Sequence, residues 1–247
     1  MLGLPSGINT CLFDLDGVLT QTAKVHAKAW KQMFDEFLKT WYNRKGEAYR
    51  EFVLPDDYER YVDGKPRRDG VRSFLESRGI DLPTGGPDDS PDDETIYGLG
   101  YRKNDLVLKL IHDEGVEPYE GSVRYAERAR DAGLNRAVVS SSENAKDVLK
   151  SAGMLDLFEV IIDGLVATRD HLAGKPAPDT FLAGAKAFGV EPSQAAVFED
   201  AEAGVAAGRA GHFGWVVGVD RTDHARALHA HGADVVVQDL SELLDQP

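Results

Sequence analysis

Short apolar runs recur along the chain, and each is followed by a polar or small residue and then by a stretch with helical spacing. The first run spans residues 8–13, and the others span 135–139, 158–162, 195–198, 215–219 and 233–237. Apolar runs that alternate with helical segments are typical of a parallel sheet with helices wound on both faces. We therefore predict an α/β fold with a doubly wound parallel sheet.

The helical segments between these runs have recognisable ends. Ser122 and Ser142 are of a residue type that caps helix N-termini, whereas Gly133 and Gly153 are suited to end helices. The spacing of these residues predicts helices of about ten to twelve residues, close to the usual length in globular proteins.

Residues 22–112 interrupt the alternation. They are rich in Lys, Arg, Glu and aromatic residues at helical spacing, and no part of them has the pattern of a strand. We therefore predict a small all-helical cap domain at 22–112, inserted after the first strand of a core domain made of residues 1–21 and 113–247. Within the cap, residues 82–95 are dense in Gly, Pro and Asp, which predicts an exposed loop. A calcium loop is the alternative, but the Gly and terminal Glu at the required spacing are missing.

The net charge of the chain disfavours some classes of binding partner. The 247 residues carry a formal net charge of −14, so the general field repels nucleic acid and anionic membranes, despite the local basic patch at 65–68. We expect neither a nucleic-acid nor a membrane partner. An anionic substrate must then be met by locally placed cations or by a metal ion.

The remaining composition points to a reducing compartment. Cys11 is the only cysteine and lies inside an apolar run, which indicates a small buried side chain rather than a disulfide. No stretch approaches the roughly 18 consecutive apolar residues of a membrane span, and the N-terminal residues lack the pattern of a signal peptide. We expect a cytoplasmic protein, and no feature calls for more than a monomer.

Polar side chains follow three of the predicted strands. Asp14 and Asp16 follow the first strand, Ser140 the second, and Glu199 and Asp200 the fourth. The carboxyl ends of parallel strands meet at one edge of the sheet, so these groups are expected to converge there. Asp16 lies two residues along the strand from Asp14, so we expect it to return to the same face. A divalent cation would neutralise such a group of carboxylates.

Lys175 would add an ammonium group to this edge. It lies beside Pro176 and Pro178, which fix the chain before a helix begins. Each residue has an ordinary structural alternative when taken alone. An Asp-x-Asp pair is commonly a turn or cap, a Lys near prolines is commonly solvated, and Ser140 could only cap a helix.

The ordered set of motifs resembles the haloacid dehalogenase superfamily. The motifs are DLDGVL at 14–19, VVSSS at 138–142, GKPAPD at 174–179 and FEDAEAG at 198–204. The resemblance covers essentially the whole chain and implies that family's α/β core, with phosphoryl transfer through an aspartyl phosphate and Mg²⁺ as cofactor.

The same resemblance implies a role for each residue of the core. Asp14 would be the nucleophile and a Mg²⁺ ligand, and Asp16 the general acid and base, with its backbone carbonyl on the metal. Asp200 and Glu199 would complete the metal site. Ser140 and Lys175 would hold the oxygens of the transferring phosphoryl group.

The insertion resembles the helical cap of the β-phosphoglucomutase branch. Three stretches carry this closer match: LTQTAKVHAKAW at 19–30, VDGKPRRDG at 62–70 and YRKND at 101–105. The resemblance implies that His26 contacts the general acid and a sugar hydroxyl, and that Arg67 grips the phosphate that does not react. The full substrate-binding set that it implies is His26, Trp30, Gly64, Arg67, Lys103, Asn104, Ser141, Ser142 and Asn144.

Some alternatives and departures belong to this closer match. His26 could simply pack on Trp30, one helical turn away, and one of the adjacent Arg67 and Arg68 could be solvated. The residues that depart from the branch's pattern are Gln21, Asp63 and Glu143, and the loop at 76–100 is longer than in compact members.

We therefore expect a Mg²⁺-dependent sugar phosphomutase that acts on a small phosphorylated sugar. It would interconvert β-glucose 1-phosphate and glucose 6-phosphate through an aspartyl phosphate and glucose 1,6-bisphosphate. The alternative is a phosphatase for a small sugar phosphate or related phosphomonoester, in which water replaces the second sugar hydroxyl. A non-catalytic sugar-phosphate sensor is a third hypothesis, which loss of Asp14 or Asp16 would favour, but both are present.

Overall fold

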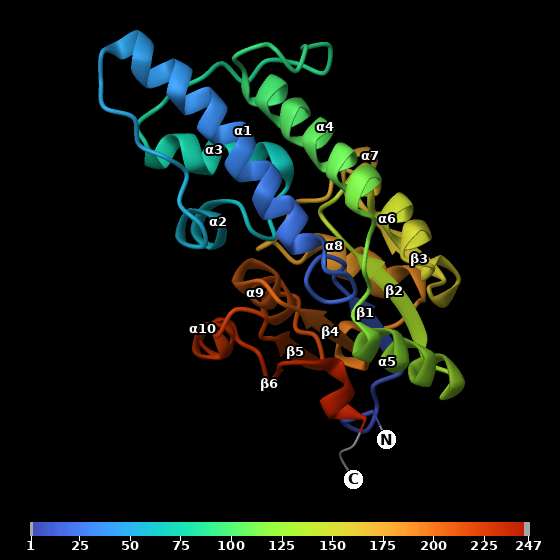
Figure 1. The fold of residues 1–247 in the computed structure, drawn as a ribbon. Coiled ribbons are helices and arrows are strands. Elements are labelled where there is room, and N and C mark those ends of the chain that lie inside the picture. The colour runs from blue at the N-terminus through green and yellow to red at the C-terminus, as the bar shows by residue number, and fades with distance from the viewer. Residues whose placement is uncertain (1, 245–247) are drawn as a thin grey trace. The chain divides into compact units, whose positions relative to one another are not determined.

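The computed structural model describes residues 2–244, and the chain forms two compact units (Figure 1). We call Met1–Thr22 with Val116–Pro247 the sheet unit, and Ala23–Gly115 the helical unit. The division of the sequence into domains at 21/22 and 112/113 stays a prediction, because compactness does not test whether each part folds by itself.

The sheet unit contains a parallel sheet with the strand order β3-β2-β1-β4-β5-β6. The strands are β1 (Thr10–Phe13), β2 (Asn135–Val139), β3 (Val160–Ile162), β4 (Ala195–Glu199), β5 (Trp215–Val219) and β6 (Val235–Val237). Each overlaps a predicted apolar run, so the predicted α/β fold is confirmed. The chain order reverses at β1, between β2 and β4, and such a switch point is where ligands bind in folds of this kind.

Alternation along β1 divides the core between the two faces of the sheet. Leu12 belongs to a cluster with Phe181 of α8 (Asp179–Ala187) and Leu228 of α10 (Ala225–His231). Phe13 points to the other face, where its ring stacks on that of Phe198 with 4.5 Å between centroids. It also lies 6.1 Å from the ring of Tyr125 in α5 (Glu120–Asp131). Helices therefore cover both faces, which holds β1 and the residues after it in the middle of the core.

The helices of the sheet unit are mostly shorter than predicted. They are α5 (Glu120–Asp131), α6 (Ala145–Ser151), α7 (Gly164–Arg169), α8 (Asp179–Ala187), α9 (Glu202–Ala210) and α10 (Ala225–His231), with 3₁₀ turns η1 (Leu155–Leu157), η2 (Pro192–Gln194) and η3 (Leu240–Leu243). Among these described helices only α5, with 12 residues, reaches the expected length. The length prediction was wrong for the others. The strands have only 3 to 5 residues, so a short helix is enough to return the chain along the sheet.

The two predicted serine caps were also wrong. Ser122 lies inside α5, which starts after Tyr119, and its hydroxyl donates to the carbonyl of Val18 at 2.7 Å instead. Asn144, not Ser142, directly precedes α6. A serine hydroxyl can bond to any nearby carbonyl, so its presence alone does not fix a helix start. Gly133 and Gly153 do follow helix ends, both with positive φ, as predicted.

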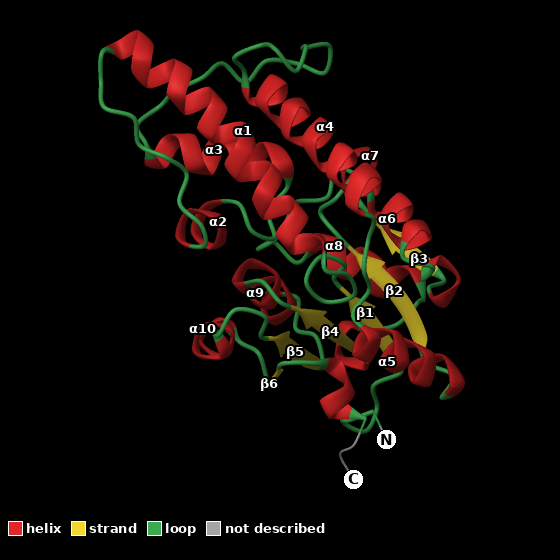
Figure 2. Cartoon of the chain, viewed as in Figure 1, coloured by secondary structure: helices red, strands yellow, loops and turns green. Residues whose placement is uncertain are grey.

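The helical unit contains α2 (Asp56–Tyr61), α3 (Arg67–Ser77), α4 (Ile96–Glu114) and nearly all of α1 (Thr22–Lys45). Between 23 and 115 the structure has helices and loops and no strand (Figure 2). The core of this unit is aromatic: the ring of Phe34 lies 4.2 Å from Phe74, 5.1 Å from Phe52 and 5.3 Å from Trp30, between ring centroids. Residues 82–95 form a largely exposed loop, as predicted.

Among the described residues, no helix combines the length and the apolar character that crossing a bilayer requires.

Candidate active site

Three buried charged side chains meet at the carboxyl end of β1. Asp14 directly follows the strand, and its N–H donates to the carbonyl of Phe198 at 2.9 Å, which ties it to β4. The ammonium group of Lys175 lies 2.5 Å from Asp14 Oδ1 and also donates to Glu199 Oε1. The exposed fractions are 7% for Asp14, 3% for Lys175 and 1% for Glu199. The predicted convergence of these three residues is therefore present in the structure.

The segment before α8 positions Lys175 beside the two carboxylates. Pro178 directly precedes the helix, so Lys175 lies on the fixed segment that enters it, as the proline pattern predicted. Its ammonium group also donates to the carbonyl of Val139 at 3.3 Å and lies 4.9 Å from the centre of the Phe181 ring. The side chain is thus held by strand β2, by α8 and by both carboxylates.

Burial is the largest single influence on the pKa of both Asp14 and Lys175. It raises the pKa of Asp14 well above the usual range; the nearby Lys175 cation offsets part of this rise, whereas the charges of Glu199 and Asp16 add to it. Burial by itself lowers the pKa of Lys175, but Asp14 and Glu199 outweigh that effect and raise it. One ammonium group therefore faces more carboxylate charge than it can neutralise, which favours a further cation.

Asp14, Glu199 and Asp200 fit a divalent cation. Each offers a carboxylate oxygen, and these oxygens all lie within 4.8 Å of one another. Carboxylate oxygens are the ligands that Mg²⁺ and Ca²⁺ prefer. The three residues form the acidic part of the site that the sequence placed at this edge, and they are the groups that could hold the metal.

Two glycines make room for these carboxylates. Gly17 has φ +86°, and a Cβ there would lie 1.7 Å from Asp200 Oδ2. A Cβ at Gly204 in α9 would lie 1.8 Å from Glu199 Oε1. Side chains at either position would therefore displace a proposed metal ligand.

Asp16 is positioned by a turn and not by a strand, contrary to the prediction. Strand β1 ends at Phe13, so alternation along a strand does not orient Asp16, and that part of the prediction was wrong. The chain turns instead, and the turn is closed by the Gly17 N–H, which donates to the Thr20 carbonyl at 2.8 Å. The Asp16 carboxylate accepts a hydrogen bond from the hydroxyl of Thr22, and that hydroxyl lies 2.7 Å from the hydroxyl of Thr20.

The residues after β2 form a hydrogen-bonded turn into α6. Ser140 is 2% exposed, and its hydroxyl accepts from the N–H of Ser142 at 3.0 Å. The hydroxyl of Ser142 accepts from the N–H of Asn144 at 3.2 Å, and Ser141 lies between these residues. The structure thus groups Ser140, Ser141, Ser142 and Asn144 on one turn.

Three of the predicted residues of the helical unit also come together. The ammonium group of Lys103, in α4, lies 2.9 Å from His26 Nδ1 and 4.9 Å from the centre of the Trp30 ring. Lys103 is 5% exposed and Trp30 is 3% exposed. His26 therefore has a polar partner as well as a nearby tryptophan. Asn104 follows Lys103 in the same helix.

Arg67 and Gly64 lie at the start of α3. Arg67 is the first residue of that helix, and its guanidinium lies 6.0 Å from the centre of the Tyr101 ring. Its side chain runs past Gly100, where an added Cβ would lie 3.6 Å from Arg67 Cγ. Gly64, in the loop before α3, has φ +68°. The neighbouring Arg68 lies 4.7 Å from the ring of Tyr97, so both arginines are placed on aromatic rings.

Sequence reasoning missed Arg221 and His224, which lie in the loop after β5. Arg221 donates to the carbonyl of Gly17, and His224 lies 2.9 Å from the carbonyl of Asp200. A signal was present, because the polar stretch DRTDH at 220–224 follows a strand of the same sheet. It was passed over because it belongs to none of the four motifs.

Comparisons with known proteins agree with this architecture. The model of the haloacid dehalogenase-like hydrolase family matches residues 8–212. A β-phosphoglucomutase from Mycobacterium bovis is 55% identical over 247 residues, which cover 99% of this chain and 94% of that protein. A validoxylamine A 7'-phosphate phosphatase from Streptomyces hygroscopicus subsp. limoneus is 30% identical over 235 residues, 94% of each chain.

A solved structure shows the same fold. The crystal structure of a β-phosphoglucomutase from Clostridium difficile superposes with a TM-score of 0.72 and 25% sequence identity, covering 96% of this chain and 93% of that one.

Proposed function

The chain belongs to the haloacid dehalogenase-like hydrolase family, in its β-phosphoglucomutase-like branch, and we propose that it is a Mg²⁺-dependent sugar phosphomutase. It would interconvert β-glucose 1-phosphate and glucose 6-phosphate through an aspartyl phosphate and glucose 1,6-bisphosphate. The observation that carries this proposal is the 55% identity to a β-phosphoglucomutase over nearly the full length of both chains. The buried Asp14–Lys175–Glu199 group supports it, because it provides a nucleophile and charge stabilisation in one place.

In this proposal Asp14 attacks the phosphorus atom and carries the phosphoryl group between the two half-reactions. Lys175 is held 2.5 Å from Asp14 Oδ1 and neutralises charge that develops on the transferring group. Ser140, at the end of the neighbouring strand β2, donates its hydroxyl to the same group. Mg²⁺, held by Asp14, Glu199 and Asp200 with the backbone carbonyl of Asp16, would neutralise the phosphoryl oxygens.

Asp16 is the proposed general acid and base. It protonates the leaving oxygen in one half-reaction and takes the proton from the attacking hydroxyl in the other. The bond from Thr22 holds one oxygen of its carboxylate, so the side chain is oriented before the substrate arrives. This would spare the entropy of fixing it during the reaction.

The substrate contacts remain those that the family resemblance implies. Arg67 binds the phosphate that is not transferred, as a planar guanidinium suits, together with Ser142 and Asn144. His26, Trp30, Gly64, Lys103, Asn104 and Ser141 complete the proposed substrate-binding set. The observed contact of Lys103 with His26 supports a shared polar role for this pair.

A phosphatase is the second candidate. It is favoured by the 30% identity to a validoxylamine A 7'-phosphate phosphatase over nearly the whole chain. The same proposed nucleophile and metal would serve either reaction. The two differ only in whether a sugar hydroxyl or water accepts the phosphoryl group.

Phosphorus NMR distinguishes the two reactions. The protein is given β-glucose 1-phosphate with Mg²⁺ and a trace of glucose 1,6-bisphosphate. The mutase proposal predicts that the signal of glucose 6-phosphate grows at the expense of the substrate signal. Growth of inorganic phosphate instead would assign the protein as a phosphatase, and α-glucose 1-phosphate is the control for the anomer.

A further inference from the structure

The loop after β5, residues 220–224, bonds to both loops that carry the proposed catalytic carboxylates. Arg221 reaches the loop after β1, and His224 reaches the loop after β4. We propose that this loop is a brace that fixes the two catalytic loops relative to each other, with Arg221 and His224 as positioning residues for phosphoryl transfer. The inference rests on the proposed function, because it takes Asp14 as nucleophile and Asp200 as metal ligand.

Arg221 uses its whole guanidinium to hold main-chain carbonyls. Nε lies 2.7 Å from the carbonyl oxygen of Gly17, Nη2 lies 3.4 Å from that of Val18, and Nη1 lies 2.6 Å from that of Gln238. Its Cζ lies 3.5 Å from the centre of the Tyr119 ring, so the plane is stacked as well as bonded. Lysine has one ammonium group and no plane, so it cannot reproduce this set of contacts.

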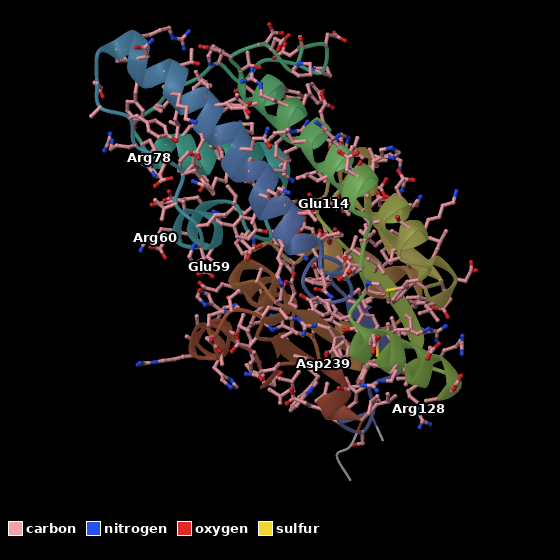
Figure 3. All side chains as sticks on the ribbon, viewed as in Figure 1. Glu59, Arg60, Arg78, Glu114, Arg128 and Asp239 are labelled. Carbon is pink, nitrogen blue, oxygen red and sulfur yellow. The ribbon has the colours of Figure 1, made fainter. Side chains whose placement is uncertain are left out.

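The carbonyls of the loop after β1 are held one by one. Val18 accepts a second hydrogen bond from the hydroxyl of Ser122 at 2.7 Å, and Leu19 accepts from the N–H of Tyr119 at 2.9 Å. Arg221 supplies the bond to the carbonyl of Gly17, the residue that must take a positive φ beside Asp200. Its side chain is 15% exposed, and Nη1 lies 3.7 Å from the carboxylate of Asp239, which is labelled in Figure 3.

His224 holds the loop after β4 in a comparable way. A carbonyl oxygen only accepts, so His224 Nε2 carries the hydrogen of the 2.9 Å bond to Asp200. The other ring nitrogen lies 2.8 Å from the hydroxyl of Thr222 and 3.1 Å from Asp220 Oδ1. Asp220 in turn accepts from the N–H groups of His224 at 2.9 Å and Ala225 at 3.1 Å, which fixes the ring to its own loop.

The two braced loops touch each other. A Cβ on Gly17 would overlap Asp200 Oδ2, so the turn after Asp14 and the proposed metal ligand are in contact at the point where the brace holds both. A shift of either loop changes the position of Asp14 relative to Asp200. A misplacement of about 1 Å can cost about 100-fold in rate, and loss of an outer partner of a metal ligand costs about 10- to 100-fold in affinity or activity.

The test uses four variants of the full chain. They are Arg221→Lys, His224→Ala, His224→Gln and the control Arg226→Lys at an exposed arginine in α10. Three quantities are measured for each: kcat for phosphoryl transfer, the Mg²⁺ dissociation constant by calorimetry, and hydrogen exchange of the amides at 15–20 in the protein without substrate.

The brace predicts a different defect for each position. Arg221→Lys lowers kcat by about 10- to 100-fold and speeds amide exchange at 15–20. His224→Ala weakens Mg²⁺ binding by about tenfold or more. His224→Gln recovers most of that affinity, because its amide nitrogen can donate to Asp200. The control matches wild type in all three.

The proposal would be overturned if Arg221→Lys kept both the wild-type kcat and the wild-type rate of amide exchange. It would also be overturned if His224→Ala bound Mg²⁺ with wild-type affinity, or if the two His224 variants lost Mg²⁺ affinity equally. If Arg221→Lys does not fold, the His224 pair still decides. If the wild-type protein transfers no phosphoryl group, the proposed function fails, whereas amide exchange still tests the brace.

Discussion

The reactivity of the single cysteine reports how tightly the centre of the sheet is packed. Cys11 lies in β1 with no exposed surface, and burial raises the pKa of its thiol to about 12, with a small opposing effect from Arg136. The thiol is thus protonated in the folded protein at pH 9, where an unfolded thiol, with an ordinary pKa of 9.0, would be about half ionised. Because the folded state then holds the extra proton, stability falls as the pH rises above 9.

We therefore expect the native protein to resist a thiol reagent at pH 9 and to react with it fully in denaturant. The rate of labelling by a disulfide reagent, followed with and without urea, checks this. Fast labelling of the native protein would show that β1 is more accessible than the structure indicates.

Lys175 is the residue whose loss disturbs the charge balance most. Its removal leaves Asp14 and Glu199 buried without their ammonium partner, and breaking a buried ion pair from one side costs about 3–5 kcal/mol. Lys175→Met is therefore expected to lower the free energy of unfolding by roughly that amount in chelator, and Mg²⁺ should recover part of it.

Urea unfolding with EDTA or with Mg²⁺ measures both effects. Lys186→Met, at an exposed lysine in α8, the helix that follows Lys175, is the control and should change stability little. A Lys175 variant as stable as the control would contradict the buried charge group.

At the level of the elements, substitutions at two glycines with positive φ distinguish the effect of backbone strain from the effect of changed active-site geometry. Gly7 has φ +97° with open space around its Cβ position, whereas Gly17 has φ +86° and faces Asp200. Alanine at either position adopts a left-handed conformation that costs about 1–2 kcal/mol. Only Gly17→Ala should also displace a proposed metal ligand.

We expect Gly7→Ala and Gly17→Ala to lose similar stability in chelator, whereas only Gly17→Ala loses Mg²⁺ affinity and activity. Calorimetric Mg²⁺ binding and urea unfolding give the two readings. Equal Mg²⁺ affinity in the two variants would argue that Asp200 does not bind the metal.

The strands were predictable from the sequence, whereas the details of their ends were not. The apolar runs located all six described strands, because buried parallel strands need apolar residues on both faces. The start of α5 was missed, because the hydroxyl of Ser122 bonds to Val18, far away in the sequence. The place of Asp16 depends on a turn and on Thr22, which strand periodicity does not describe.

At the scale of the whole molecule, the helical unit is expected to determine the substrate. Arg67→Ala should raise KM for a bisphosphorylated sugar far more than it slows hydrolysis of a small aryl phosphate, because only the former has a second phosphate to hold. Steady-state kinetics with both substrates make the comparison, and Arg72→Ala, at an arginine of the same helix whose side chain is 43% exposed, is the control. Equal losses on the two substrates would place Arg67 in a structural role.

The sequence predicted candidate site residues in each unit, but not all of the residues that contact them. The four ordered motifs located Asp14, Lys175 and Glu199, which the structure brings together. Arg221 and His224 were missed because they bond to main-chain carbonyls. Every residue has a main-chain carbonyl, so the sequence does not indicate which one a distant side chain will contact. Contacts of this kind become visible only when the fold is known.

The central claim is that Asp14 carries the phosphoryl group, and acid-quenched mass spectrometry tests it most directly. The protein is mixed with Mg²⁺ and glucose 1,6-bisphosphate, quenched in acid, digested and examined for the added mass of one phosphoryl group. The account predicts this mass on the peptide that contains Asp14, its loss with hydroxylamine, and its absence in Asp14→Asn, which should also lose turnover while remaining folded. A phosphoryl group on another residue, or turnover by Asp14→Asn within about tenfold of wild type, would contradict the account.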